Sequence, residues 1–350
     1  MMETEKRIGI LTGGGDCPGL NAAIRAVTKT AIPEGYQVIG IRNGWQGLLD
    51  DDTEILDRIK TSGIIDRGGT ILGTSRISPL QVENGSQRVF DAFKRLGLTA
   101  LVVLGGEGTL SVASKLFDMG LPLVGIPKTI DNDVKGTDYT IGFQTAVEIA
   151  TEALDRLRTT AESHHLVMLL EVMRRHAGWI AVYAGMANGA DAILIPEIPL
   201  DDEKLESLCQ MLMTRKSRGV NFSIVAVAEG TILQGKTVAQ EYVDIPGGGQ
   251  RPRLGGVAAV LAEIIEKKTT LETRVSSLGY IQRGGTPVAY DRSLAIGFGV
   301  KAVTLIQDKK YGQMTALKGN RISTTPLSEV VDGIKPVPLT AYRIAERFFG

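Results

Sequence analysis

Short runs of consecutive apolar residues alternate along the chain with segments of helical periodicity. Most of these runs are apolar at every position, which is typical of strands buried on both faces of a parallel sheet. Several are followed directly by glycine or proline, residues that end regular structure. The predicted strands cover residues 8–11, 38–41, 101–104, 123–126, 166–170, 192–195 and 224–228.

The clearest predicted helix covers residues 144–160. Its apolar positions follow the i, i+3, i+4 spacing of a single buried stripe. These positions are Ala146, Ile149, Ala150, Ala153, Leu154 and Leu157. The repeated order of strand, glycine turn and helix predicts an α/β fold with doubly wound, mainly parallel sheets.

Two stretches do not follow this pattern. Residues 244–256 contain two prolines and three consecutive glycines, which predicts a surface loop. The alternative is a lid that grasps phosphate through Arg251 and Arg253. From residue 321 onward no clear periodicity appears until 342–349.

Composition narrows the class of protein. The chain has 350 residues, which suits two α/β domains better than one small core. Lys+Arg and Asp+Glu both number 39, and this balance argues against nucleic-acid binding, which usually leaves a basic footprint. Cys17 and Cys209 cannot form a disulfide framework, and no apolar run reaches the ~20 residues of a membrane span. We therefore expect a cytoplasmic protein without a membrane partner.

The first candidate site is the glycine-rich turn at residues 12–21, which follows a predicted strand and opens a helix. Glycines and a helix N-terminus expose backbone N–H groups to an anion such as phosphate. The dinucleotide fingerprint fails at Pro18, and the P-loop pattern fails at Leu20 and Asn21. A tight turn without a ligand is the structural alternative.

Two more turns follow buried predicted strands. Residues 105–109 place Glu107 among glycines, where a carboxylate can hold Mg²⁺ beside phosphate-binding N–H groups. Residues 127–133 carry Lys128, Asp131 and Asp133, so that one carboxylate is able to accept a proton from a hydroxyl nucleophile. Ordinary tight turns remain the structural alternative for both.

Arg76, Arg175 and Arg283 lie at the ends of stretches with few charges. A single arginine is usually a solvated surface charge, but an arginine beside glycines suits a fork for phosphate oxygens. Glycine turns, a metal carboxylate, an aspartate pair and arginines together favour phosphoryl transfer to a phosphorylated alcohol.

With these motifs in place, the chain resembles the 6-phosphofructokinase family, which phosphorylates the 1-hydroxyl of fructose 6-phosphate. The resemblance runs from about residue 7 to about residue 302. It depends most on the segments 127–143 (PKTIDNDVKGTDYTIGF) and 278–287 (LGYIQRGGTP), which are very specific together.

The resemblance implies two similar α/β lobes with the active site in the cleft between them. It places a larger, donor-binding lobe at 1–142 with 282–334, and a smaller, sugar-phosphate lobe at 143–281 with 335–350. It also implies a homotetramer, because in the family some arginines reach the sugar phosphate from a neighbouring subunit.

The site residues are carried over motif by motif. The resemblance makes Asp131 the base for the sugar 1-hydroxyl, flanked by Thr129 and Asp133, with Arg175 near the transferred phosphoryl group. It makes Glu107 the Mg²⁺ ligand, where the family usually has Asp. The implied donor-binding residues are Gly15, Arg76, Ile77, Gly106, Glu107, Gly108, Thr109 and Lys128. The implied sugar-binding residues are Thr129, Ile130, Asp131, Met173, Arg174, Arg175, Glu229, Arg274, Tyr280, Ile281, Gln282 and Arg283.

Three positions depart from the family pattern. Leu166 falls where many members have a phosphate-gripping arginine, Arg174 falls where many have glycine, and Tyr280 replaces a common histidine. We therefore expect altered sugar-phosphate binding with the chemistry intact. A sugar-phosphate or nucleotide sensor is the non-catalytic alternative. A kinase of another small alcohol is a second enzymatic alternative, much weaker than phosphofructokinase.

The donor depends on two positions that point in opposite directions. Gly108 leaves room for a nucleotide α-phosphate, whereas the pyrophosphate-using branch has Asp there. Lys128 is the pyrophosphate-like residue. Because a missing carboxylate removes both bulk and repulsion, ATP is favoured, with ADP or pyrophosphate as alternatives. Arg25, Arg58 and Arg158 match basic positions of the family's allosteric site, but Lys29 and Gly63 do not match, and regulation stays open.

Overall fold

The structure is a computed structural model that describes residues 6–173, 176–244 and 250–350, with the backbone alone at 239–254. It divides into two compact units. Unit 1 comprises Met1–Thr145 and Arg283–Lys335, and unit 2 comprises Ala146–Gln282 and Pro336–Gly350. The assignment of donor binding to one lobe and sugar binding to the other stays a prediction.

The sheet of unit 1 has the strand order β15-β14-β5-β4-β1-β2-β3. Neighbouring strands are parallel except at the two edges, where β3 and β15 run antiparallel. Its strands are β1 (Lys6–Thr12), β2 (Tyr36–Ile41), β3 (Thr53–Leu56), β4 (Leu98–Gly105), β5 (Leu123–Pro127), β14 (Gln313–Lys318) and β15 (Arg321–Pro326).

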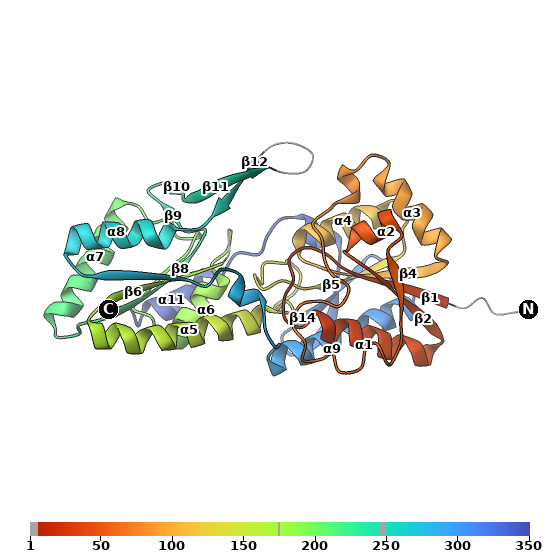
Figure 1. Ribbon diagram of the computed structural model, residues 1–350, viewed down its shortest axis with the longest axis horizontal. Coiled ribbons are helices and arrows are strands. Elements are labelled where there is room, and N and C mark those ends of the chain that lie inside the picture. Colours follow the sequence, from red (N-terminus) through yellow and green to blue (C-terminus); the bar gives the residue numbers. More distant parts are fainter. Residues whose placement is uncertain (1–5, 174–175, 245–249) are drawn as a thin grey trace, which may run out of the picture. The chain divides into compact units, whose positions relative to one another are not determined.

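Helices cover both faces of this sheet. On one face α1 (Leu20–Ala31) packs against α9 (Ala289–Gln307), as Figure 1 shows. The other face carries α2 (Trp45–Asp50), α3 (Gly85–Arg95), α4 (Glu107–Asp118) and α10 (Ser328–Val331). The central strands are almost entirely buried between the layers, as their continuous apolar runs predict.

The sheet of unit 2 has the order β13-β6-β8-β7, and all its neighbours are parallel. Helices α7 and α8 pack together on one face, whereas α6 and α11 pack together on the other (Figure 1). The strands are β6 (Val167–Val172), β7 (Ala192–Leu194), β8 (Ser223–Ala228) and β13 (Thr273–Ser277). The helices are α5 (Phe143–His164), α6 (Trp179–Asn188), α7 (Asp202–Ser217), α8 (Val257–Thr269) and α11 (Leu339–Glu346).

The remaining strands of unit 2 are two antiparallel ribbons. They pair β9 (Ile232–Leu233) with β10 (Lys236–Thr237), and β11 (Ala239–Asp244) with β12 (Gln250–Leu254).

The predicted fold class is confirmed: both units are α/β with mainly parallel sheets. Every predicted strand overlaps an observed one, namely β1, β2, β4, β5, β6, β7 and β8, and the predicted helix 144–160 lies within α5. The buried parallel strands were predictable because each carries its own unbroken apolar run.

The predictions missed strands at sheet edges and in ribbons. The surface loop expected at 244–256 is wrong at Gln250–Leu254, which pairs along its length with β11. Residues 245–249 and the side chains of Arg251 and Arg253 lie outside what the structure describes. The C-terminal region from 321 onward contains β15, which pairs with β14. The missed edge and ribbon strands have one neighbour each and carry no continuous apolar run, unlike the edge strand β7, which was predicted from its run. The strand β14 was also missed, although it lies between β5 and β15, because polar residues interrupt its apolar ones.

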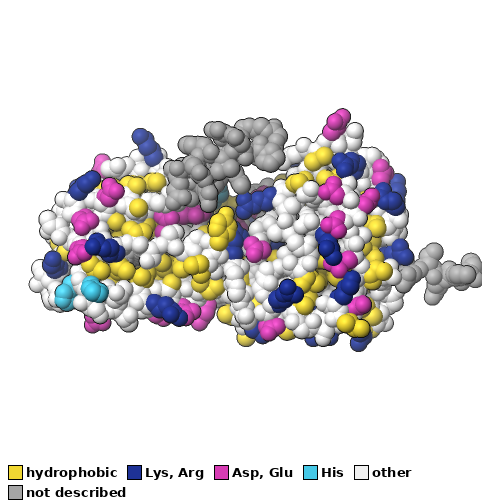
Figure 2. Space-filling view, viewed as in Figure 1, with side chains coloured by type: hydrophobic (Ala, Val, Ile, Leu, Met, Phe, Trp, Pro, Cys, Tyr) yellow, Lys and Arg dark blue, Asp and Glu magenta, His cyan; other side chains and the backbone are white. Residues whose placement is uncertain are grey.

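No helix in the described segments is long and apolar enough to cross a membrane. On the face shown in Figure 2, positive and negative side chains are interspersed over each unit. This distribution agrees with the balanced composition.

Candidate active site

The three glycine- and aspartate-containing turns of unit 1 meet at the carboxyl edge of its sheet. The Gly13 N–H donates to the Leu104 carbonyl at 2.9 Å, which joins the turn after β1 to the end of β4. The Lys128 N–H donates to the Gly105 carbonyl at 2.9 Å and joins the turn after β5 to the same point. Ligands of open α/β sheets bind outside this edge.

Glycine is required in these turns because neighbouring side chains occupy the space of a Cβ. The Thr109 side chain fills the space beside Gly105 and Gly13, where a Cβ on Gly13 would lie 2.7 Å from the Thr109 methyl group. The Arg283 guanidinium fills the corresponding space beside Gly15. An added Cβ at Gly108, by contrast, would meet no atom within 4 Å.

Two cationic side chains hold the turn after β1. The Lys128 ammonium donates to the Gly15 carbonyl at 2.6 Å, and Arg283 donates to the Asp16 carbonyl at 3.2 Å. Lys128 is only 1% exposed, and this burial lowers its pKa. Burial also raises the pKa of the neighbouring Cys17 thiol to about 12, so this cysteine stays protonated at neutral pH. The arrangement concentrates positive charge at a turn suited to phosphate.

The N-terminus of α4 provides a second anion-binding feature. Gly106 precedes the helix and makes no side-chain cap, so backbone N–H groups of the first turn keep their capacity for a ligand. Glu107 lies in this turn and accepts a hydrogen bond from the Ser111 hydroxyl at 3.0 Å.

Glu107 fits a Mg²⁺ ion that is completed by substrate. The described residues contain no group of three or more histidine, cysteine or acidic side chains that would form an all-protein metal cage. Mg²⁺ is commonly held by one or two carboxylates, water and substrate phosphates. A single carboxylate beside an uncapped helix N-terminus is consistent with such a site.

The 129–140 loop after β5 carries the predicted base. The Thr129 hydroxyl donates to Asp131 Oδ2 at 3.0 Å, and the Asp131 N–H donates back to that hydroxyl at 3.2 Å. Asp131 and Asp133 are 8% and 3% exposed. Asn132, between them, has a left-handed backbone with φ of 51°. These contacts fix the Asp131 carboxylate at the sheet edge.

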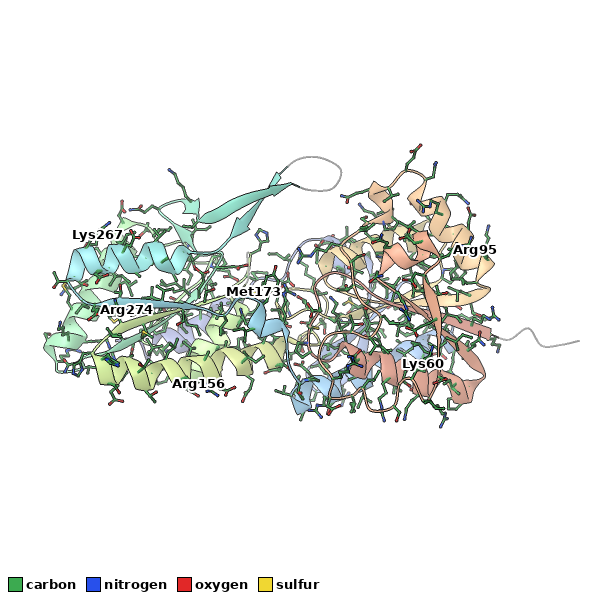
Figure 3. All side chains as sticks on the ribbon, in the orientation of Figure 1. Lys60, Arg95, Arg156, Met173, Lys267 and Arg274 are labelled. Carbon is green, nitrogen blue, oxygen red and sulfur yellow. The ribbon has the colours of Figure 1, made fainter. Side chains whose placement is uncertain are left out.

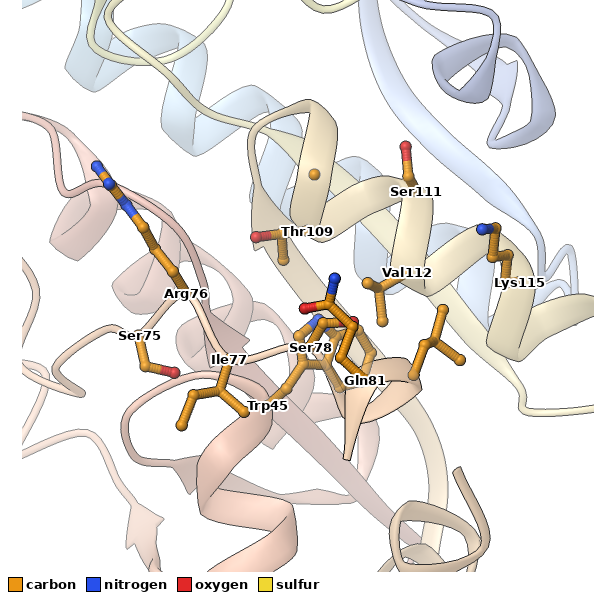
Figure 4. A pocket seen from close by; sticks show the side chains of 12 residues that line it. Trp45, Ser75, Arg76, Ile77, Ser78, Gln81, Thr109, Ser111, Val112 and Lys115 are labelled. Carbon is orange, nitrogen blue, oxygen red and sulfur yellow. The ribbon is translucent and has the colours of Figure 1, made fainter. Parts of the chain in front are cut away.

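A cavity of about 450 Å³ lies in unit 1 between α4 and the segment around η2 (Pro79–Gln81), as Figure 4 shows. It brings together four predicted donor residues, Arg76, Ile77, Gly108 and Thr109. Its remaining lining residues were not predicted: Trp45, Ser75, Ser78, Leu80, Gln81, Ser111, Val112 and Lys115. Three of them could have been predicted from Gly108, since helical spacing places Ser111, Val112 and Lys115 on the same face of α4.

In unit 2 most of the predicted sugar-binding residues follow the carboxyl ends of the strands, whereas Arg274 is the second residue of β13 and pairs with Met168 near the amino end of β6. The Glu229 N–H donates to the Val172 carbonyl at 2.9 Å, and the Leu278 N–H donates to the Glu171 carbonyl at 3.1 Å. These bonds bring the ends of β6, β8 and β13 together, with Met173, labelled in Figure 3, directly after β6.

Several of these residues are open to solvent. Tyr280 and Ile281 are 68% and 65% exposed. Arg274, labelled in Figure 3, is exposed on β13, forms an ion pair with Glu272 and donates to the Thr273 carbonyl. Gln282 is fully buried and donates to the Gly279 carbonyl at 3.1 Å.

The predicted sugar-binding set is divided between the units. Thr129, Ile130, Asp131 and Arg283 belong to unit 1, and Arg283 lies against the turn after β1. Arg174 and Arg175 lie outside the described residues.

Two further residues from the sequence analysis are part of the scaffold of unit 2. Leu166 is 9% exposed and contributes to the core. Arg158, from the suggested effector site, donates to the carbonyls of Asn188 and Gly189 at 2.8 and 2.9 Å. Its guanidinium therefore fastens α5 to the end of α6.

Comparison with known proteins adds a family to this geometry. Residues 7–306 match the phosphofructokinase family. The chain is 49% identical over 346 residues to a Streptomyces coelicolor protein named pyrophosphate–fructose 6-phosphate 1-phosphotransferase, covering 98% of this chain and 100% of that one. It is 48% identical over 345 residues to another S. coelicolor protein named ATP-dependent 6-phosphofructokinase 3, covering 97% and 99%.

A solved structure agrees with these similarities. The crystal structure of Pichia pastoris phosphofructokinase in the T-state matches with a TM-score of 0.84 at 31% identity, over 99% of this chain. The match covers 37% of the Pichia chain, so this protein spans little more than a third of that longer polypeptide. The similarity to this structure confirms the predicted fold.

Proposed function

The chain belongs to the phosphofructokinase family, and from this premise we propose that it transfers a phosphoryl group from ATP to the 1-hydroxyl of fructose 6-phosphate, giving fructose 1,6-bisphosphate and ADP in glycolysis. The observation that carries the choice of ATP is the cavity of about 450 Å³ that reaches Gly108 and Thr109. Pyrophosphate has no base or ribose to fill such a space.

The open position at Gly108 supports the same donor. Because no atom lies within 4 Å of an added Cβ, the space beside α4 is free of protein at this residue. An aspartate there would place bulk and negative charge where the nucleotide is expected to run. Lys128 favours neither donor, since its ammonium is bonded to the Gly15 carbonyl. Relatives with both kinds of name are similarly close in sequence.

The proposed reaction is a direct in-line transfer. Asp131 accepts the proton of the sugar 1-hydroxyl, while the Thr129 hydroxyl, bonded to Asp131 Oδ2, orients the carboxylate. Glu107 would hold Mg²⁺, which neutralises the charge of the donor phosphates when bound. The N–H groups of the first turn of α4 and the cation Lys128 orient those phosphates. We assign Arg175 to the transferring phosphoryl group.

On the sugar side we propose that Met173, Arg174, Glu229, Arg274 and residues 280–283 bind fructose 6-phosphate. The exposure of Arg274 and Tyr280 supports a homotetramer in which such residues serve a neighbouring subunit. We further propose that the enzyme acts in the cytoplasm.

The test is an activity panel with ATP, ADP and pyrophosphate at one Mg²⁺ concentration, using the parent and Gly108→Asp. We expect the parent to prefer ATP. We expect the variant to fold normally, because the position is open, and to lose nucleotide use by at least about tenfold through repulsion and lost space. Asn320→Asp, which adds the same charge at an exposed turn residue of unit 1, controls for a general effect of the charge.

Equal ATP use by the parent and Gly108→Asp would contradict the argument from this position. If the parent were active with pyrophosphate alone, pyrophosphate and not ATP would be the donor. If no product formed with any of the three donors, the sensor alternative would be favoured.

A further inference from the structure

The 129–140 loop is anchored by a part of the chain beyond the family match, which ends at residue 306. The Leu317 N–H, in β14, donates to the Thr137 hydroxyl at 2.9 Å, and the Asp138 N–H donates to the Leu317 carbonyl at 2.9 Å. From β15, the Thr325 hydroxyl donates to the Gly136 carbonyl at 2.8 Å. The hairpin β14–β15 therefore supports the second half of the loop.

Lys335 connects the two halves of the loop. Its backbone N–H donates to the Asp133 carbonyl at 2.7 Å. Its ammonium donates to the carbonyls of Thr137 and Asp138 at 2.7 and 2.9 Å. One residue thus spans the loop from position 133 to position 138, next to an antiparallel bridge between Val134 and Ile334.

The bond to Asp138 links Lys335 to the residue after the proposed base. The Asp138 carbonyl accepts a second hydrogen bond, from the Asn132 side-chain amide, at 3.1 Å. The Asn132 amide oxygen in turn accepts from the Thr140 N–H at 3.0 Å. Because Asn132 has a left-handed backbone, its conformation depends on such contacts. Two hydrogen bonds that share the Asp138 carbonyl therefore join Lys335 to Asn132, the covalent neighbour of Asp131.

A reciprocal contact strengthens the same junction. Lys135, within the loop, donates from its ammonium to the Asp332 carbonyl at 2.6 Å. The loop and the segment 332–335 thus each contribute one lysine that donates to carbonyls of the other. The Lys335 bond to Thr137 lies in a half-buried position, whereas its bond to Asp138 and the Lys135 contact are exposed to water.

We propose that Lys335 is a positioning residue that holds the Asp131 carboxylate at its working place by closing the loop between Asp133 and Asp138. The proposal rests on the proposed function of Asp131. A flexible four-carbon stem that ends in several donors suits two adjacent carbonyls. Small displacements of a reacting group cost large factors in rate, so loss of this contact should act on the chemical step.

The experiment compares steady-state kinetics of the parent, Lys335→Met and Lys335→Arg. We expect Lys335→Met to lower kcat by about 10- to 100-fold while both KM values change less than about threefold, since the substrates are held by other residues. Lys335→Arg, which keeps a charged donor, should recover most of kcat. Lys310→Met, at an exposed lysine of unit 1 paired with Asp308, is the matched control and should match the parent.

A purely structural role would lower the melting temperature of Lys335→Met while leaving kcat per folded molecule unchanged, and would overturn the proposal. If that variant does not fold, Lys335→Gln, which keeps one amide donor, replaces it, with kcat expected to fall by about 3- to 10-fold. An unchanged kcat in Lys335→Gln would also overturn the proposal.

Asp131→Asn, measured in parallel, separates the two proposals. A slow Asp131→Asn beside an unimpaired Lys335→Met overturns the positioning role alone. An Asp131→Asn variant as fast as the parent overturns the proposed base, and the positioning role with it.

Discussion

The carboxyl edges of the two sheets are built differently. In unit 1, Lys128, Asp131 and Asp133 are almost entirely buried and their neighbours are closely hydrogen-bonded. In unit 2, Tyr280 and Ile281 at the corresponding edge are mostly exposed. The first edge holds its groups in place before any ligand binds, whereas the second offers side chains that are still free to adjust.

This difference matches two kinds of task. Proton abstraction requires a carboxylate within hydrogen-bonding reach of its target, and preorganisation serves that step directly. Gripping a phosphate requires charge and adaptable donors, and long arginines provide both. We therefore expect substitutions at the unit 1 edge to act on kcat, and those of the proposed sugar-binding residues of unit 2 to act on KM.

The largest effect should come from Asp131→Asn. Because the amide cannot accept the sugar proton, we expect kcat to fall by ~10²–10⁴-fold with both KM values close to those of the parent. Steady-state rates with ATP and fructose 6-phosphate measure this. Asp118→Asn, at an exposed carboxylate of α4, is the control and should leave kcat unchanged. A kcat of Asp131→Asn equal to that of the parent would contradict the proposed catalytic role of the unit 1 edge.

Arg274→Ala tests the proposed sugar-binding residues of unit 2. Loss of a charged donor to phosphate typically costs 1.5–3 kcal/mol, so we expect KM for fructose 6-phosphate to rise about 10- to 100-fold, with kcat nearly constant. The melting temperature should barely move, because the ion pair with Glu272 is exposed. Lys267→Ala, at another exposed ion pair of unit 2, is the control. A fall in kcat at constant KM would contradict the proposed division of tasks.

The smallest effect concerns stability at alkaline pH. Burial lowers the pKa of Lys335 from its usual 10.5 to about 8, so between these pH values the unfolded chain binds more protons than the folded one. Stability contributed by this group must therefore rise as pH increases from about 8 to about 10.5, by about 1–3 kcal/mol.

Urea unfolding of the parent and Lys335→Met at pH 7.5 and pH 10 measures this contribution. Other titrating groups largely cancel in the difference between the two proteins. We expect the unfolding free energy of the parent, relative to that of Lys335→Met, to be larger at pH 10 than at pH 7.5. A difference that stays constant would show that Lys335 keeps an ordinary pKa, and that its surroundings in unit 1 are more solvated than its contacts indicate.

Much of the scaffold could be predicted from local pattern. Buried parallel strands carry continuous apolar runs, and glycines mark the turns that follow β1 and β4. The reason that glycine is needed could not be predicted. Gly13 and Gly105 leave space for the Thr109 side chain, and Gly15 leaves space for Arg283, which lies more than 250 residues away in sequence.

Contacts between distant segments had no local signal. The buried Glu171 carboxylate accepts hydrogen bonds from the N–H groups of Gly256 and Ala258, each at 3.0 Å, and so caps α8. Asp291 likewise accepts from the N–H groups of Gly142 and Thr145 at the start of α5. In sequence each of these carboxylates resembles an ordinary charged residue of a strand or helix.

By itself, the sequence determined the α/β class, the positions of the glycine-rich turns and the family, because short-range periodicity and contiguous motifs carry that information. Only the tertiary structure decided which cations hold those turns, where the cavity beside Gly108 lies, and that Lys335 closes the loop of Asp131. These depend on where distant segments come to lie once the apolar strands are buried, and no neighbouring residue encodes that.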